Sequence, residues 1–107
     1  MTDHDSAALR TLLARLITDG AHHARCAGLS RIDEGRIVHS GFAAGFHLAA
    51  MYAADILATG SLHGRSCHPV EPADETAAQH VLDHLPDNPA DRARAVQNAI
   101  YDPRAAS

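Results

Sequence analysis

The sequence predicts an all-α protein, a four-helix bundle-like single domain built around a long central second helix. Apolar residues recur at helical spacing in four segments, and no segment shows the alternation of β-branched residues that is typical of a strand. Alanine is abundant and tryptophan is absent, which favours closely packed helices over a sheet. Because the chain has 107 residues, we expect one domain spanning 1–107.

The first helix follows a polar N-terminal tail, residues 1–5, which we expect to be disordered. Ser6 is a suitable N-cap, because its side-chain oxygen can accept a hydrogen bond from a free backbone N–H group. Gly20 either ends this helix or is tolerated inside it, and in the second case the helix ends near Gly28. The apolar stripe that predicts the helix comprises Leu9, Leu12, Leu13, Leu16 and Ile17.

A connector over 29–35 leads to the long second helix, for which Ser40 or Asp33 is the expected N-cap. Gly60 marks its end, since glycine adopts the left-handed conformation after a helix without a steric clash. One face of this helix is predicted to pack into the core of the bundle. That face comprises Val38, Phe42, Gly45, Ala49, Tyr52 and Ile56.

The opposite face of the second helix is also mostly apolar and small. A helix that is apolar on nearly all sides is normally buried on nearly all sides, so we expect a second copy of the chain to cover this face. His47 can meet Asp55 of the other copy if the helices cross antiparallel, or both side chains reach solvent at the edge of the bundle. The predicted homodimer interface comprises Ala43, His47, Ala50, Met51 and Asp55.

The remaining chain holds a loop and two shorter helices. Residues 61–72 contain Gly and Pro and predict a loop, followed by a helix from Ala73 or Asp74 to Leu85. The fourth helix is expected to have Asn88 as its N-cap and to end near Tyr101. The predicted core comprises Leu9, Leu12, Leu13, Leu16, Ile17, Val38, Phe42, Tyr52, Ile56, Val81, Leu82, Val96 and Ile100.

Composition argues against two classes of partner. A membrane span needs about 20 predominantly apolar residues with few charges, whereas His47 and Asp55 interrupt the second helix. The acidic start of the chain does not resemble a signal peptide, so we expect a cytoplasmic protein. A formal net charge of −4 with scattered arginines argues against nucleic-acid binding.

Two His–Cys pairs are the candidate metal ligands. His22 and Cys26 are four residues apart, as are His63 and Cys67, and together they form a Cys2His2 set suited to zinc. Chance is the competing explanation, because the chain contains nine His and zinc sites normally have closer Cys spacing. His80 and His84 share the same spacing, and we expect them to lie in solvent.

The 61–72 loop is the place where a small enzyme would carry its chemistry. Cys67 is a candidate nucleophile, with His63 or His68 as its base and Glu71 as the group that orients the base. Adjacent side chains rarely face each other correctly, and no complete catalytic motif is present, so we favour a non-catalytic function.

Three segments resemble the HEPN family of small helical domains. They are 46–54 (FHLAAMYAA), 65–68 (RSCH) and 99–102 (AIYD). The resemblance implies a homodimer, often paired with a nucleotidyltransferase, and in some branches RNA cleavage by an Arg and a following His that are separated by four to six residues. Arg94 matches that Arg, but Ala99 and Ile100 stand where the His would be. The resemblance therefore implies a scaffold or regulatory role without RNase activity.

The sequence thus predicts a dimeric helical module that binds or regulates a partner. The partner that covers the second face of the long helix is either another copy of the chain or a different protein. A zinc-binding protein and a small enzyme with its site in the 61–72 loop are the two alternatives. Stoichiometric zinc would identify the zinc-binding protein, and an unusually reactive thiol would identify the small enzyme.

Overall fold

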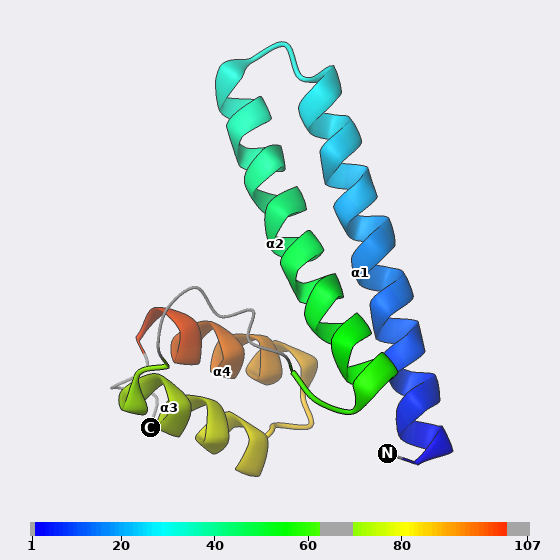
Figure 1. Ribbon diagram of the computed structural model, residues 1–107. Coiled ribbons are helices and arrows are strands. Elements are labelled where there is room, and N and C mark those ends of the chain that lie inside the picture. Colours follow the sequence, from blue (N-terminus) through cyan, green and yellow to red (C-terminus); the bar gives the residue numbers. More distant parts are fainter. Residues whose placement is uncertain (1, 63–69, 103–107) are drawn as a thin grey trace. The chain divides into compact units, whose positions relative to one another are not determined.

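The computed structural model describes residues 2–62 and 70–102, and these ranges form four helices and no strand. The helices are α1 (Asp3–Leu29), α2 (Asp33–Thr59), α3 (Pro72–Asp83) and α4 (Pro89–Tyr101) (Figure 1). The predicted all-α, bundle-like fold class with a long second helix is therefore confirmed. Residue contacts divide the chain into two units, Met1–Arg65 and Ser66–Ser107, so the expectation of a single domain stays a prediction.

Helix α1 begins earlier than expected. Thr2 is its N-cap, and the Thr2 hydroxyl accepts a hydrogen bond from the backbone N–H of Asp5 at 3.1 Å. Residues from Asp3 onward are therefore helical, so the expected disorder over 1–5 is wrong for residues 3–5, and the expected Ser6 cap is wrong. The helix continues through Gly20, which agrees with the alternative in which this glycine is tolerated inside the helix.

A tight connection joins α1 to α2. Helix α2 already begins at Asp33, and its N-cap position is Ile32, which makes no side-chain capping bond. Neither Asp33 nor Ser40 is therefore the cap, and the connector is shorter than the 29–35 expected. The Arg36 guanidinium braces this turn instead, donating to the backbone oxygen of Ser30 at 3.1 Å and pairing with Asp33. At its other end α2 stops as predicted, with Gly60 left-handed at φ 82°.

Helices α1 and α2 run antiparallel and side by side along their length (Figure 1). Less exposed residues recur on each helix at alternating spacings of three and four, which is the 3.5-residue repeat of a coiled coil. In α2 every residue from 49 to 57 is also buried or half-buried. We call this line of contact the seam. It comprises Leu9, Leu13, Leu16, Gly20, His23 and Ala27 of α1, and His39, Ala43, Phe46, Ala50, Ala53 and Leu57 of α2.

The predicted core is wrong in most of its members. Among the described residues only Ala50, Ala53 and Ala77 are buried. Leu9, Leu13, Leu16, Tyr52, Ile56 and Val81 are half-buried, whereas Leu12, Ile17, Val38, Phe42, Leu82, Val96 and Ile100 are exposed. The reason is that α1 contacts α2 along one narrow seam, so apolar residues beside that seam stay in solvent.

The second unit is a shorter helical hairpin in which α3 packs against α4. Helix α3 runs over Pro72–Asp83, so it begins one or two residues earlier and ends two residues earlier than expected. Helix α4 agrees with the sequence: the Asn88 side chain accepts from the backbone N–H groups of Ala90 and Asp91, and Pro89 is the first helical residue. The two helices share an open groove of about 290 Å³ lined by Ala78, Val81, Leu82, Val96, Ala99 and Ile100.

Candidate functional site

One flank of the α1–α2 hairpin is hollowed into an apolar groove of about 410 Å³. Both helices contribute to it, because the seam forms the floor and the next residues around each helix form the rim. Ile17 on the rim is 55% exposed. The groove is lined by Leu16, Ile17, Gly20, Ala21, Ala24, Ala43, Phe46, His47 and Ala50.

No side chain that lines this groove carries a formal charge at neutral pH, with His counted as neutral. The other flank of the hairpin carries the ion pair between Arg15 and Asp19, whose Nε and Oδ2 atoms lie 3.0 Å apart. It also has a smaller open groove of about 290 Å³, again without a charged lining residue, lined by Leu16, Gly41, Phe42, Gly45, Phe46 and Ala49. Most of the residues that line the larger groove are alanine or glycine, so another helix can approach it closely. An exposed apolar patch of this kind commonly marks an interaction site.

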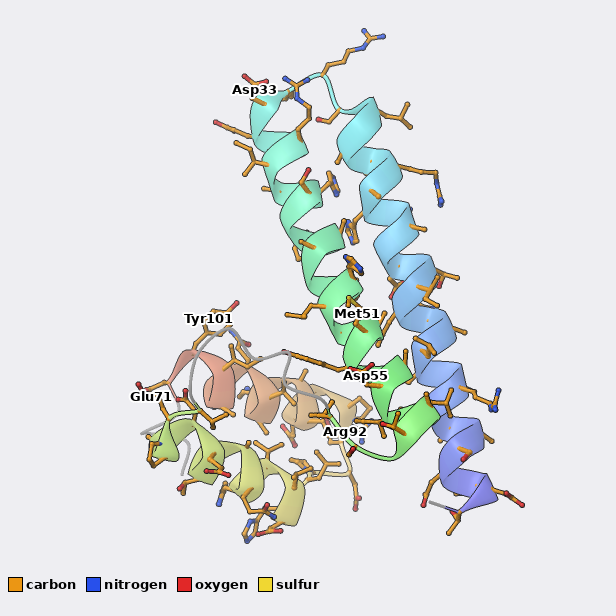
Figure 2. All side chains as sticks on the ribbon, viewed as in Figure 1. Asp33, Met51, Asp55, Glu71, Arg92 and Tyr101 are labelled. Atoms are coloured by element: carbon orange, nitrogen blue, oxygen red, sulfur yellow. The ribbon has the colours of Figure 1, made fainter. Side chains whose placement is uncertain are left out.

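The structure brings three of the five predicted interface residues into this groove. Ala43 and Ala50 lie in its floor and His47 lies on its rim. Ala50 is only 9% exposed, so it already packs within the chain. Met51 and Asp55, which are half-buried, follow one another along α2 beyond the groove (Figure 2).

Four aromatic and imidazole rings form a cluster at the seam that was not predicted from the sequence. His23 of α1 and His39 of α2 lie with their Nδ1 atoms 2.9 Å apart. The His23 ring stacks on Phe46 with centroids 5.6 Å apart and lies 4.9 Å from the Phe42 ring. The available signal was the 3.5-residue repeat, which places His23 after Gly20 on α1 and His39 before Ala43 on α2.

The predicted zinc ligands are brought together only in part. His22 and Cys26 are exposed and half-exposed neighbours on α1, with Nε2 and Sγ 3.6 Å apart. His63 and Cys67 lie outside the described residues. Within residues 2–62 and 70–102, no group of three or more His, Cys, Asp or Glu side chains is arranged to hold a metal ion.

The candidate catalytic loop cannot be assembled from the described part of the chain, since His63, Cys67 and His68 all lie outside it. Glu71 is exposed at the N-cap position of α3 and makes no side-chain capping bond (Figure 2). His80 and His84 stack with ring centroids 4.5 Å apart, and both are exposed as expected.

Helix α2 is long and apolar enough to cross a membrane by length and composition alone, with a mean hydropathy of 1.3 over its most apolar window. A core helix of a soluble protein passes the same test, so the expectation of a cytoplasmic protein without a membrane span stays a prediction.

Comparison with known proteins does not assign a family or a function to the groove. No protein family, no curated protein and no solved structure matches the chain.

Proposed function

We propose that the protein is a non-catalytic binding or regulatory module that acts as a homodimer, in the manner that the HEPN resemblance implies. In this proposal the larger groove on the α1–α2 hairpin receives the same groove of a second copy. The observation that supports it best is the uncharged, apolar lining of that groove in a chain whose only buried described residues are Ala50, Ala53 and Ala77.

The dimensions of the hairpin suit a dimer interface. Each of its helices has 27 residues, which corresponds to a length of about 40 Å. A pair of helices is roughly 20 Å wide, so one flank of the hairpin offers on the order of 800 Å². Stable protein interfaces bury about 800 Å² on each partner.

Association would also supply the core that one hairpin lacks. Helical domains bury their apolar stripes between packed layers, and a single pair of helices has only one seam. Two hairpins joined groove to groove form a four-helix arrangement in which Ile17 and Phe46 become interior residues. The small side chains of Ala21 and Ala24 would let the helices of the two copies pack at close range.

A charge placed in the groove tests this proposal. Ala21 lines the groove and is exposed in the single chain, so Ala21→Glu should leave the hairpin folded and place a carboxylate in the dimer interface. Ala50→Arg is a weaker test because Ala50 is 9% exposed, and its replacement would disturb the hairpin itself. We expect wild-type protein to be a dimer in native mass spectrometry and Ala21→Glu to weaken association at least tenfold.

Thr18→Glu is the matched control, since it adds the same charge to an exposed position of α1 that does not line the groove. It should stay dimeric at the concentration at which Ala21→Glu is monomeric. A monomeric wild-type protein, or an Ala21→Glu protein as dimeric as the control, would contradict the proposal.

Zinc binding is the second candidate, supported by the 3.6 Å contact between His22 Nε2 and Cys26 Sγ. Structural zinc normally has four protein ligands, so this pair needs two more. The same mass measurement decides between the candidates. A zinc-bearing species that is lost in Cys26→Ser would favour the metal protein, and a zinc-free dimer would favour the interaction module.

A further inference from the structure

Two exposed histidines are held side by side at the end of α3. His80 lies in the last turn of the helix, and His84 occupies its C-cap position. Their rings stack with centroids 4.5 Å apart and an interplanar angle of 29°. Both side chains are exposed, so the packing of α3 against α4 does not explain why the rings meet.

The hydrogen bonding of His84 leaves a defined ring nitrogen available. Its Nδ1 atom lies 3.2 Å from the backbone oxygen of His80. A carbonyl oxygen can only accept, so His84 Nδ1 carries a hydrogen and donates it, and the neutral ring then has a bare Nε2. Histidines that bind metals almost always donate their other ring N–H in this way to a backbone carbonyl, a carboxylate or water, which fixes the orientation of the ring.

The separation of the two rings suits one small metal ion. Zinc binds imidazole nitrogens at about 2.0–2.1 Å in tetrahedral geometry, so two ligating nitrogens lie roughly 3.4 Å apart. Rings with centroids 4.5 Å apart can each bring one nitrogen to that separation by small side-chain rotations. Imidazole is a ligand for zinc and its neighbours among the transition metals, whereas Mg²⁺ and Ca²⁺ prefer oxygen ligands.

The charge around the pair favours a cation. No Arg or Lys occurs in residues 70–91, which hold the carboxylates of Glu71, Asp74, Glu75, Asp83, Asp87 and Asp91. The C-terminal end of a helix carries partial negative charge and stabilises cations placed near it. Arg92, the next arginine along the chain, is engaged by backbone oxygens of the turn between α3 and α4.

We propose that His80 and His84 form a surface site for Zn²⁺, with water in the remaining coordination positions. Two protein ligands leave two positions of a tetrahedral zinc ion for water. The ion bridges the last turn of α3, and because it binds the folded helix it stabilises that turn. This site is separate from the groove and from the His22–Cys26 pair, which belong to the other unit of the chain.

Imidazole ¹⁵N spectra of the full-length protein test this site. Before metal is added, His84 should show the Nδ1–H tautomer. We expect added Zn²⁺ to shift Nε2 of His84 together with one ring nitrogen of His80, whereas Mg²⁺ at the same concentration should shift neither. In His84→Asn the zinc concentration that shifts His80 should rise at least tenfold, because a single remaining ligand loses the advantage of two linked ones.

His22→Asn is the matched control, since it removes an exposed histidine of the other unit and should leave the zinc response of His80 and His84 unchanged. Zinc that remains in Cys26→Ser and is lost in His84→Asn is expected for this site. The proposal is overturned if His80 responds equally in His84→Asn and wild type, or if wild-type His84 shows the Nε2–H tautomer. Neither result would affect the proposed dimer, which is measured by mass.

Discussion

At the scale of single residues, the absence of one side chain determines how closely the two long helices approach. A Cβ atom added at Gly20 would lie 3.2 Å from the Cβ of Phe46, which is closer than ordinary van der Waals contact. Gly41 provides the contrast, because a Cβ atom there would meet nothing within 4 Å. Glycine at position 20 is thus part of the packing, whereas glycine at position 41 only lowers helix propensity.

This contrast predicts opposite effects for the same substitution. Gly41→Ala should stabilise the protein by about 0.5–1 kcal/mol, because alanine loses less conformational entropy on forming a helix. Gly20→Ala gains the same helix propensity but crowds Phe46, and overpacking costs about 1–3 kcal/mol, so we expect a net loss of about 1 kcal/mol. Urea unfolding at one fixed protein concentration measures both. Equal gains for the two variants would show that the helices can separate at no cost.

Histidine pairs illustrate how much residue context matters. His22 and His23 are adjacent in the sequence, yet His22 is exposed beside Cys26 whereas His23 is half-buried against α2. Of these two, only His23 contacts a second imidazole, that of His39, across the seam.

At the scale of the elements, the helices differ in how their first turns are satisfied. The Thr2 and Asn88 side chains cap α1 and α4, whereas the N-cap positions of α2 and α3 make no side-chain capping bond. Arg92 adds to the start of α4 by donating to the backbone oxygens of Pro86 and Asp87. Helix α4 is therefore the short helix with the most strongly defined beginning.

Removal of that cap should weaken α4 measurably. Asn88→Ala deletes the acceptor used by the N–H groups of Ala90 and Asp91, and loss of such a cap typically costs about 1 kcal/mol. We expect lower helical circular dichroism and an earlier unfolding midpoint in urea. Asn98→Ala, on an exposed position within the same helix, should leave both values unchanged or slightly higher. A cap variant as stable as the Asn98 variant would mean that Arg92 alone defines this helix end.

At the scale of the whole molecule, the high helix content contrasts with the small number of buried residues. The described ranges are almost entirely helical, yet they bury only three alanines. Large apolar side chains such as Phe42, at 53% exposed, and Val38, at 52%, remain in solvent in the single chain. In the proposed dimer, association through the groove would cover Ile17, which is 55% exposed, whereas Phe42 and Val38 do not line that groove.

If stability depends on that association, it must depend on protein concentration. A dimer that unfolds to separate chains gains about 1.4 kcal/mol for each tenfold increase in concentration. For a protein of this size that corresponds to a rise in the thermal midpoint of several degrees. Thermal unfolding of wild-type protein and Ala21→Glu over a hundredfold range of concentration measures this effect. A wild-type midpoint that does not change with concentration would contradict the proposed dimer.

The sequence by itself determined the number of helices and several of their ends. Gly60 after α2 and Asn88-Pro89 at the start of α4 specify those ends through local backbone conformation and hydrogen bonding, which need no distant contact. The start of α2 was missed because Ile32 gives no capping signal. Helix content could therefore be predicted from the sequence, whereas the start of α1, which Thr2 caps, and the uncapped start of α2 were placed too late.

Only the tertiary structure decided which face of each helix meets the other. Helix α2 is apolar on nearly all sides, so its sequence permits several stripes, and the predicted core stripe through Phe42 and Tyr52 lies beside the observed seam. The stripe through Phe46 packs against α1 because Gly20 of α1 leaves room for the Phe46 side chain. That complementarity joins residues far apart in the chain, and it also brings His23 to His39. Helix formation is local and can be predicted from a single segment of sequence, whereas the seam and its histidine pair depend on the fit between two helix surfaces.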